Sequence, residues 1–101
     1  MTVRILAEAE LELNDAIVHY EKIDVVLSRR LKTEAGRVLQ RIKRNPELPR
    51  IHPRGYPRIN LRVFPYYIAY FLWSDTIWIL TFAHGHREPE YWINRTGRFV
   101  P

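Results

Sequence analysis

The chain has 101 residues, no cysteine, and 16 lysines and arginines against 11 aspartates and glutamates, which gives a net charge of +5 at pH 7. A chain of about 100 residues forms one domain with a single modest core, so residues 1–101 are expected to be one domain and a multidomain enzyme is excluded. The hydrophobic fraction of 47% excludes a disordered chain, and the lack of cysteine excludes disulfide scaffolds, thiol nucleophiles and thiolate metal sites while permitting a reducing compartment.

The first half of the chain is predicted to form a short strand and two helices. Residues 3–6 favour a strand, and apolar residues then recur at helical spacing from Ala9 to Tyr20. A second helical pattern runs from Leu27 to Ile42, with Asp24 placed to cap its start and Asn45-Pro46 placed to end it. Because the two helices follow each other closely, we expect an antiparallel αα-hairpin.

The second half is predicted to form three antiparallel strands, which makes the fold class α+β. Residues 45–57 contain four prolines and are expected to form an irregular loop that carries arginines. The strands are predicted at 58–64, 66–73 and 77–83, with Arg58, Asn60, Arg62 and Phe64 on one face of the first. The turn between the last two strands has two or three residues, and the pattern leaves that open. Residues 96–101 are expected to fray.

No stretch of the sequence indicates a membrane span or an export signal. The longest apolar stretch covers residues 63–73, which is shorter than the roughly 20 residues that a helix needs to cross a bilayer. The N-terminus enters acidic sequence without an apolar signal core. We therefore expect a cytoplasmic protein.

Charge is distributed unevenly along the chain. Residues 1–28 hold two basic and six acidic residues, whereas residues 29–101 hold fourteen basic and five acidic residues. Thirteen of the sixteen cationic side chains are arginines, whose planar fork suits phosphate and carboxylate groups. Such a surface attracts nucleic acid or an acidic protein segment, and the alternative is an ordinary solvated basic surface.

Arg58 and Arg62 are the first candidate site residues. Four residues apart on one strand, their Cα atoms would be about 13 Å apart, so long side chains could reach neighbouring phosphates or one carboxylate-bearing strand. The alternative is two solvated cations at the edge of a sheet. Arg50 and Arg54 in the proline-rich loop, together with Arg58 and His84, are candidates for binding a target.

Residues 84–92, His-Gly-His-Arg-Glu-Pro-Glu-Tyr-Trp, follow the last predicted strand and carry the second candidate site. His84 and His86 offer imidazoles, Arg87 a guanidinium and Tyr91 a phenol. RNA cleavage by the 2′-hydroxyl needs a base, an anion stabiliser and an acid, and these groups can supply them. The alternative is that each histidine is a hydrogen-bonded structural residue. His84 and His86 with Glu88 or Glu90 could mimic a metal-binding set, but no second cluster of ligating residues supports it, so we expect neither a metal nor a cofactor.

Several markers together resemble the RelE/ParE superfamily of bacterial toxins. They are Ile42 followed by Asn45-Pro46, Arg58 and Arg62 ahead of Phe-Pro-Tyr at 64–66, Ile-Ala-Tyr at 68–70, and the segment 84–92. The resemblance covers the chain from Val3 to about Arg95. It implies a growth-inhibiting toxin of a type II toxin–antitoxin pair, tied to plasmid stabilisation or stress response, and held inactive by a cognate antitoxin whose segment wraps the toxin.

The resemblance also implies two possible mechanisms. RelE-like members cut mRNA in the ribosome, and by position Arg62 and Arg87 match their phosphate-binding arginines, while Tyr91 lies near their catalytic tyrosine. ParE-like members bind and block DNA gyrase without being enzymes. The lysines of the RelE-like enzymes are absent here after Lys43, and arginine cannot replace them in proton transfer because it stays charged. His86 could transfer protons instead.

The departure from the RelE-like pattern, together with Phe-Pro-Tyr at 64–66, favours a ParE-like toxin that binds gyrase. The alternatives are a ribosome-dependent mRNA endoribonuclease, a nucleic-acid-binding module without enzymatic activity, and an inert member whose only partner is its antitoxin. We expect the antitoxin segment to be acidic and to cover an exposed apolar sheet face. All of these mechanisms require Arg58, Arg62 and Arg87 to meet in one open concavity.

Overall fold

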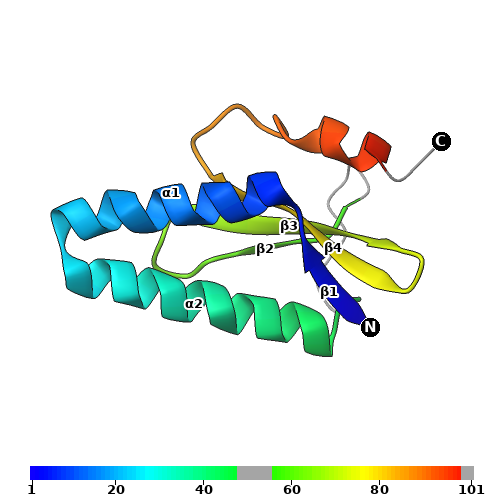
Figure 1. The fold of residues 1–101 in the computed structure, drawn as a ribbon, viewed down its shortest axis with the longest axis horizontal. Coiled ribbons are helices and arrows are strands. Elements are labelled where there is room, and N and C mark those ends of the chain that lie inside the picture. Colours follow the sequence, from blue (N-terminus) through cyan, green and yellow to red (C-terminus); the bar gives the residue numbers. More distant parts are fainter. Residues whose placement is uncertain (48–55, 99–101) are drawn as a thin grey trace.

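The computed structural model describes residues 1–47 and 56–98. It has the α+β class expected from the sequence, with a helical hairpin packed on one face of a sheet (Figure 1). In chain order its elements are β1 (Thr2–Ile5), α1 (Ala7–Ile23), α2 (Val25–Arg44), β2 (Arg58–Asn60), β3 (Tyr66–Trp73), β4 (Thr76–His84) and the 3-10 helix η1 (Ile93–Arg98).

The sheet has four strands in the order β1-β4-β3-β2. The three later strands are antiparallel, as predicted, and β1 joins them as a parallel neighbour of β4. The αα-hairpin supplies the crossover that a parallel pair of strands requires. Because β1 pairs with β4 only as far as Ile79, no strand of residues 1–47 and 56–98 lies beside the second half of β4 on that edge.

The turn between β3 and β4 has two residues, Ser74 and Asp75. Trp73 pairs directly with Thr76, and both turn residues have positive φ angles, 50° and 59°. Two positive φ angles in a two-residue hairpin are typical of a type I′ turn, whose twist matches that of the flanking strands. The question that the sequence left open is therefore settled in favour of the shorter turn.

One residue, Asp24, ends α1 and begins α2. Its backbone N–H donates to the carbonyl of Tyr20, and its side-chain Oδ1 accepts from the N–H of Val26 at 2.8 Å. The predicted N-cap is confirmed, and it explains how the two helices join without a separate loop. The expected end of α2 at Asn45-Pro46 is also confirmed.

The core lies between the helical hairpin and the sheet. The predicted inner face of α2 is buried at Leu31, Ala35, Val38 and Ile42, and Ala9 and Ala16 of α1 are buried as well. The hydroxyl of Tyr70 donates to the carbonyl of Pro46 and so ties β3 to the end of α2. Burial raises the pKa of Tyr70 to about 12.

The strand predicted over 58–64 is wrong beyond Asn60. The buried carboxylate of Glu34 on α2 accepts hydrogen bonds from the backbone N–H groups of Arg62 and Val63, the latter at 3.3 Å, and the chain bends there. Phe64 turns inward and packs edge-on against Tyr20, with ring centroids 5.2 Å apart. Because the chain no longer alternates, Arg62 and Phe64 do not share a strand face with Arg58.

The C-terminal segment is docked on the domain as far as Arg98. Trp92 is buried, and its Nε1 donates to the hydroxyl of Tyr67 at 2.9 Å. Arg98 at the end of η1 forms an ion pair with Glu8 near the start of α1, where Figure 1 shows the two elements side by side. Residues 96–98 are thus held rather than frayed, and residues 99–101 lie outside the described residues.

Candidate functional site

The three arginines expected to converge line three separate hollows. Arg58 lies over the ring of Tyr67, 3.9 Å from its centroid, and Arg87 lies over the ring of Tyr91 at the same distance. Arg62 lies beside α2 in a third hollow. The expectation of a single concavity is wrong for Arg62, because the bend takes its side chain off the strand that carries Arg58. The hollows of Arg58 and Arg87 are neighbours that share Tyr66. Arg50 and Arg54 lie outside the described residues.

A hollow of about 210 Å³ lies between α1 and the end of β4. We call it the histidine hollow, and its lining residues are Glu12, Asp15, Ala16, His19, Tyr66, Phe82, His84, Arg87 and Tyr91. It brings together His84, Arg87 and Tyr91, which the sequence had singled out. It also contains Asp15 and His19, which lie one helical turn apart on α1 and had no expected role. Their i, i+4 spacing could have indicated that they share one face of the helix.

His84 is held in a defined orientation at the rim of the histidine hollow. Its Nδ1 accepts a hydrogen bond from the backbone N–H of His86 at 3.0 Å, so the neutral ring carries its proton on Nε2. Desolvation, followed by the nearby charges of His86 and His19, lowers the pKa of His84. The lowered pKa favours the neutral ring, which can accept a proton. His86 does not line the hollow and is exposed; its backbone, rather than its imidazole, orients His84.

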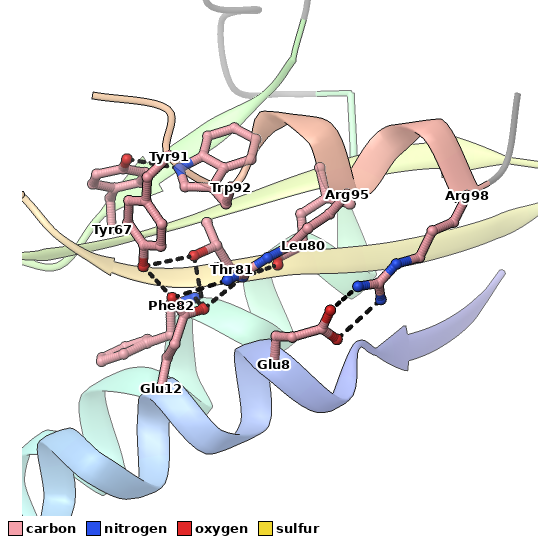
Figure 2. A network of polar contacts seen from close by, with 10 residues as sticks. All are labelled: Glu8, Glu12, Tyr67, Leu80, Thr81, Phe82, Tyr91, Trp92, Arg95 and Arg98. Carbon is pink, nitrogen blue, oxygen red and sulfur yellow. Dashed lines mark hydrogen bonds and ion pairs between the residues drawn. The ribbon is translucent and has the colours of Figure 1, made fainter. Parts of the chain in front are cut away.

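The hydroxyl of Tyr91, a member of the expected site, is already engaged in a hydrogen bond within the protein. Its hydroxyl donates to Oε2 of Glu12 and lies 3.5 Å from the hydroxyl of Thr81 (Figure 2). Burial and then the hydrogen bond to Glu12 raise the pKa of Tyr91. A phenol that holds its proton this firmly is a poor general acid near neutral pH. In this structure the hydroxyl of Tyr91 serves as a hydrogen-bond donor to Glu12.

Glu12 and Arg95 close the edge of β4 that β1 leaves open. Oε1 of Glu12 accepts from the backbone N–H of Phe82 at 3.4 Å, and Nη1 of Arg95 donates to the carbonyl of Leu80 at 2.9 Å. The two side chains also bind each other, with 2.8 Å between Nη1 and Oε1 (Figure 2). Unpaired strand edges need such partners. No local sequence pattern indicates this network, because its members are up to 83 residues apart.

A second hollow, of about 470 Å³, lies between α2 and the bend that follows β2. We call it the arginine hollow, and its lining residues are Val26, Arg29, Arg30, Thr33, Glu34, Arg37, Arg62 and Val63. The residues from α2 recur every three or four positions, so they share one face of the helix. Arg62 reaches this face because Glu34 holds its backbone there.

Two negative observations apply to residues 1–47 and 56–98. They contain no cluster of three or more histidine, aspartate or glutamate side chains arranged to hold a metal ion. None of their helices is long and apolar enough to cross a membrane.

The architecture is similar to that of a solved structure from a toxin–antitoxin system. No protein-family model and no curated protein matches the sequence. A chain of the structure titled "Chromosomal ParDE TA system from P. aeruginosa" superposes with a TM-score of 0.64, at 14% sequence identity. The match covers 83% of this chain and 95% of that chain. At this identity the likeness is one of fold.

Proposed function

We propose that this chain, which has the RelE/ParE-like fold, is the toxin of a type II toxin–antitoxin pair, kept inactive by a cognate antitoxin. The observation that carries the proposal is the fold shared, over 83% of the chain, with a chain of a ParDE system. The net charge of +5 supports it, because a basic toxin suits an acidic neutralising partner. Such a toxin would act in the cytoplasm and would need no cofactor.

Among the targets of such toxins, we propose DNA gyrase, inhibited by binding rather than by chemistry. The arrangement of the candidate catalytic groups supports this choice. Arg62 and Arg87 line different hollows, and the phenol of Tyr91 is bonded to Glu12. Every mechanism was expected to need Arg58, Arg62 and Arg87 in one concavity, and that requirement is dropped here for gyrase. Blocking a protein target needs a complementary surface but no convergence of a base, an anion stabiliser and an acid around one phosphate.

A ribosome-dependent mRNA endoribonuclease is the second candidate, and the histidine hollow is the observation that favours it. The lowered pKa of His84 favours its neutral form, which can accept the proton of a 2′-hydroxyl. Arg87, in the same hollow, can stabilise the charge that develops on the scissile phosphate. In this version His84 takes the role of the base, and the roles expected for Tyr91 and Arg62 are not required.

Two assays of the purified full chain separate these candidates. We expect it to inhibit supercoiling by gyrase at amounts stoichiometric with the enzyme, and to leave mRNA intact when ribosomes are added. The reverse result would favour the nuclease. A nucleic-acid-binding module would respond in neither assay, and would bind naked DNA or RNA with an affinity that falls steeply as salt rises.

Variants of the histidine hollow provide the matched control in cells. If the chain acts on gyrase, His84→Ala and Arg87→Ala should arrest growth as the unmodified chain does. If it is a nuclease, loss of a general base should reduce mRNA cleavage by about a hundredfold or more. Arg4→Ala, an exposed arginine on β1 outside both hollows, controls for the loss of a positive charge. A chain that never arrests growth would contradict the proposed function and leave an inert relative.

A further inference from the structure

The arginine hollow concentrates positive charge that the described part of the chain does not neutralise. Arg29, Arg30, Arg37 and Arg62 surround it, and Glu34 is the only carboxylate among the described residues that line it. Arg37 lies 3.9 Å from Glu34, but Arg29, Arg30 and Arg62 form no ion pair among residues 1–47 and 56–98. Four guanidiniums with one carboxylate leave an excess of charge that an anionic ligand would balance.

Glu34 serves the structure of the hollow more than its charge balance. Its side chain is 8% exposed, and its Oε1 receives the backbone N–H groups of Arg62 and Val63. It thereby holds the bend that presents Arg62 opposite the arginines of α2. Without this contact the hollow would lack its second wall.

Two exposed valines make the hollow amphipathic. Val26, at the start of α2, is 59% exposed, and Val63, on the bend, is 61% exposed. A phosphate backbone has no apolar groups to cover these side chains, whereas a protein segment carries carboxylates and apolar side chains side by side. Covering both valines adds a favourable apolar contribution that a phosphate backbone does not provide.

We propose that the arginine hollow is the docking site for an acidic, amphipathic segment of a partner protein. Carboxylates of the segment bind Arg29, Arg30, Arg37 and Arg62, and its apolar side chains cover Val26 and Val63. That the partner is the antitoxin rests on the proposed function. The preference of the site for an acidic, amphipathic segment rests only on its own side chains. The site lies beside α2, so it differs from the sheet face on which the sequence analysis expected the antitoxin.

The test measures binding of a synthetic amphipathic peptide of glutamate and leucine to the full chain by titration calorimetry. A peptide with glutamine in place of glutamate is the matched probe, and single-stranded RNA and duplex DNA oligonucleotides are the nucleic-acid probes. We expect the glutamate peptide to bind, and the glutamine peptide to bind at least about tenfold more weakly, because charge complementarity is lost. No measurable binding of the glutamate peptide would overturn the proposal.

Two double variants separate the charged half of the site from its apolar half. Arg30→Glu with Arg62→Glu should weaken peptide binding by about tenfold or more, since two attractions become repulsions. Val26→Ser with Val63→Ser should weaken it by about fivefold, because apolar contact is lost. Arg4→Glu with Arg44→Glu makes the same change in net charge at exposed positions outside the hollow and should change binding by less than about twofold.

Two further outcomes would overturn the proposal. One is an equal loss in the Arg4 and Arg44 control, which would show attraction to net charge alone. The other is a valine variant that binds peptide normally, together with oligonucleotide binding that depends on Arg30 and Arg62, which would make this a nucleic-acid site. Melting curves check that every variant folds. Growth arrest and gyrase inhibition are measured separately, so failure of the proposed function leaves the peptide result interpretable.

Discussion

The histidine hollow and the arginine hollow lie on the same small domain and use their polar groups in opposite ways. In the first, Glu12 and Tyr91 are bonded to each other and to the edge of β4. In the second, Arg29, Arg30 and Arg62 are free of ion pairs within the described residues. Residue types that suggest catalysis can thus serve to complete a sheet, whereas arginines that suggest ordinary solvation can form a shaped site.

The largest effect should come from breaking the network that supports the histidine hollow. Glu12→Ala removes the carboxylate that pairs with Arg95, whose side chain is only 16% exposed. We therefore expect the free energy of unfolding to fall by about 3 kcal/mol. Chemical denaturation measures this loss. Adding Arg95→Met should recover much of it, because the uncompensated charge is removed. A loss below about 0.5 kcal/mol would mean that the network does not hold the β4 edge.

Removing Glu34 from the arginine hollow should lower the free energy of unfolding by less than removing Glu12 does. Glu34→Ala leaves the backbone N–H groups of Arg62 and Val63 without their acceptor, which costs about 1–3 kcal/mol of unfolding free energy. The same variant should weaken binding of the acidic peptide, since Arg62 is no longer held in place. Glu10→Ala, an exposed position on α1, is the control and should change stability by less than about 0.5 kcal/mol. Equal effects of the two variants would contradict the role of Glu34.

Tyrosine titration tests whether the phenol of Tyr91 is held as its contacts indicate. Tyr70 has a pKa of about 12, and the pKa of Tyr91 is also raised above 10. Above pH 10 the unfolded chain loses these protons and the folded chain keeps them, so stability falls as pH rises, by up to about 1.4 kcal/mol per pH unit for each such tyrosine. Denaturation at pH 9 and pH 11 measures the fall in stability. Tyr70→Phe and Tyr91→Phe should each reduce this fall. Ionisation of Tyr91 below pH 10, seen as a tyrosinate signal, would make it a candidate general acid again.

The smallest effect concerns His84. The pKa of His84 is lower in the folded chain than in the unfolded chain, so the unfolded chain binds the proton more tightly. The free energy of unfolding is therefore at its full value above pH 6.5 and decreases as the pH falls through the folded-state pKa. NMR titration of the imidazoles should find His84 below 6.5. His19→Ala should move this pKa upward, because the charge of His19 helps to lower it. If His84 titrates above 6.5, it is largely protonated nearer neutral pH and less suited to act as a base.

The elements that sequence analysis predicted well are those set by neighbours along the chain. The cap at Asp24 depends on Val26, two residues away, and the end of α2 depends on Pro46. The strand Tyr66–Trp73 was predicted with its observed bounds, because a run of aromatic and β-branched residues favours a buried strand. Even the hairpin turn was narrowed to two choices before the φ angles of Ser74 and Asp75 decided between them.

The errors occurred where a distant side chain changed the local backbone. The alternation of residues 58–64 predicts a strand, but Glu34, 28 residues earlier, captures the backbone at Arg62 and bends it. That contact separated the arginines that were expected to converge. The segment 84–92 was correctly singled out as rich in functional groups, but the role of Tyr91 depends on Glu12, 79 residues away.

The sequence by itself determined the order of helices and strands, the excess of positive charge after residue 28 and the residue types available at each site. Local propensity and hydrophobic periodicity act over a few residues, so they can be recognised without a fold. The tertiary structure alone decided which charges are neutralised and which stay open. That outcome depends on contacts between residues far apart in the chain, which exist only once β1, the αα-hairpin and the sheet have packed together.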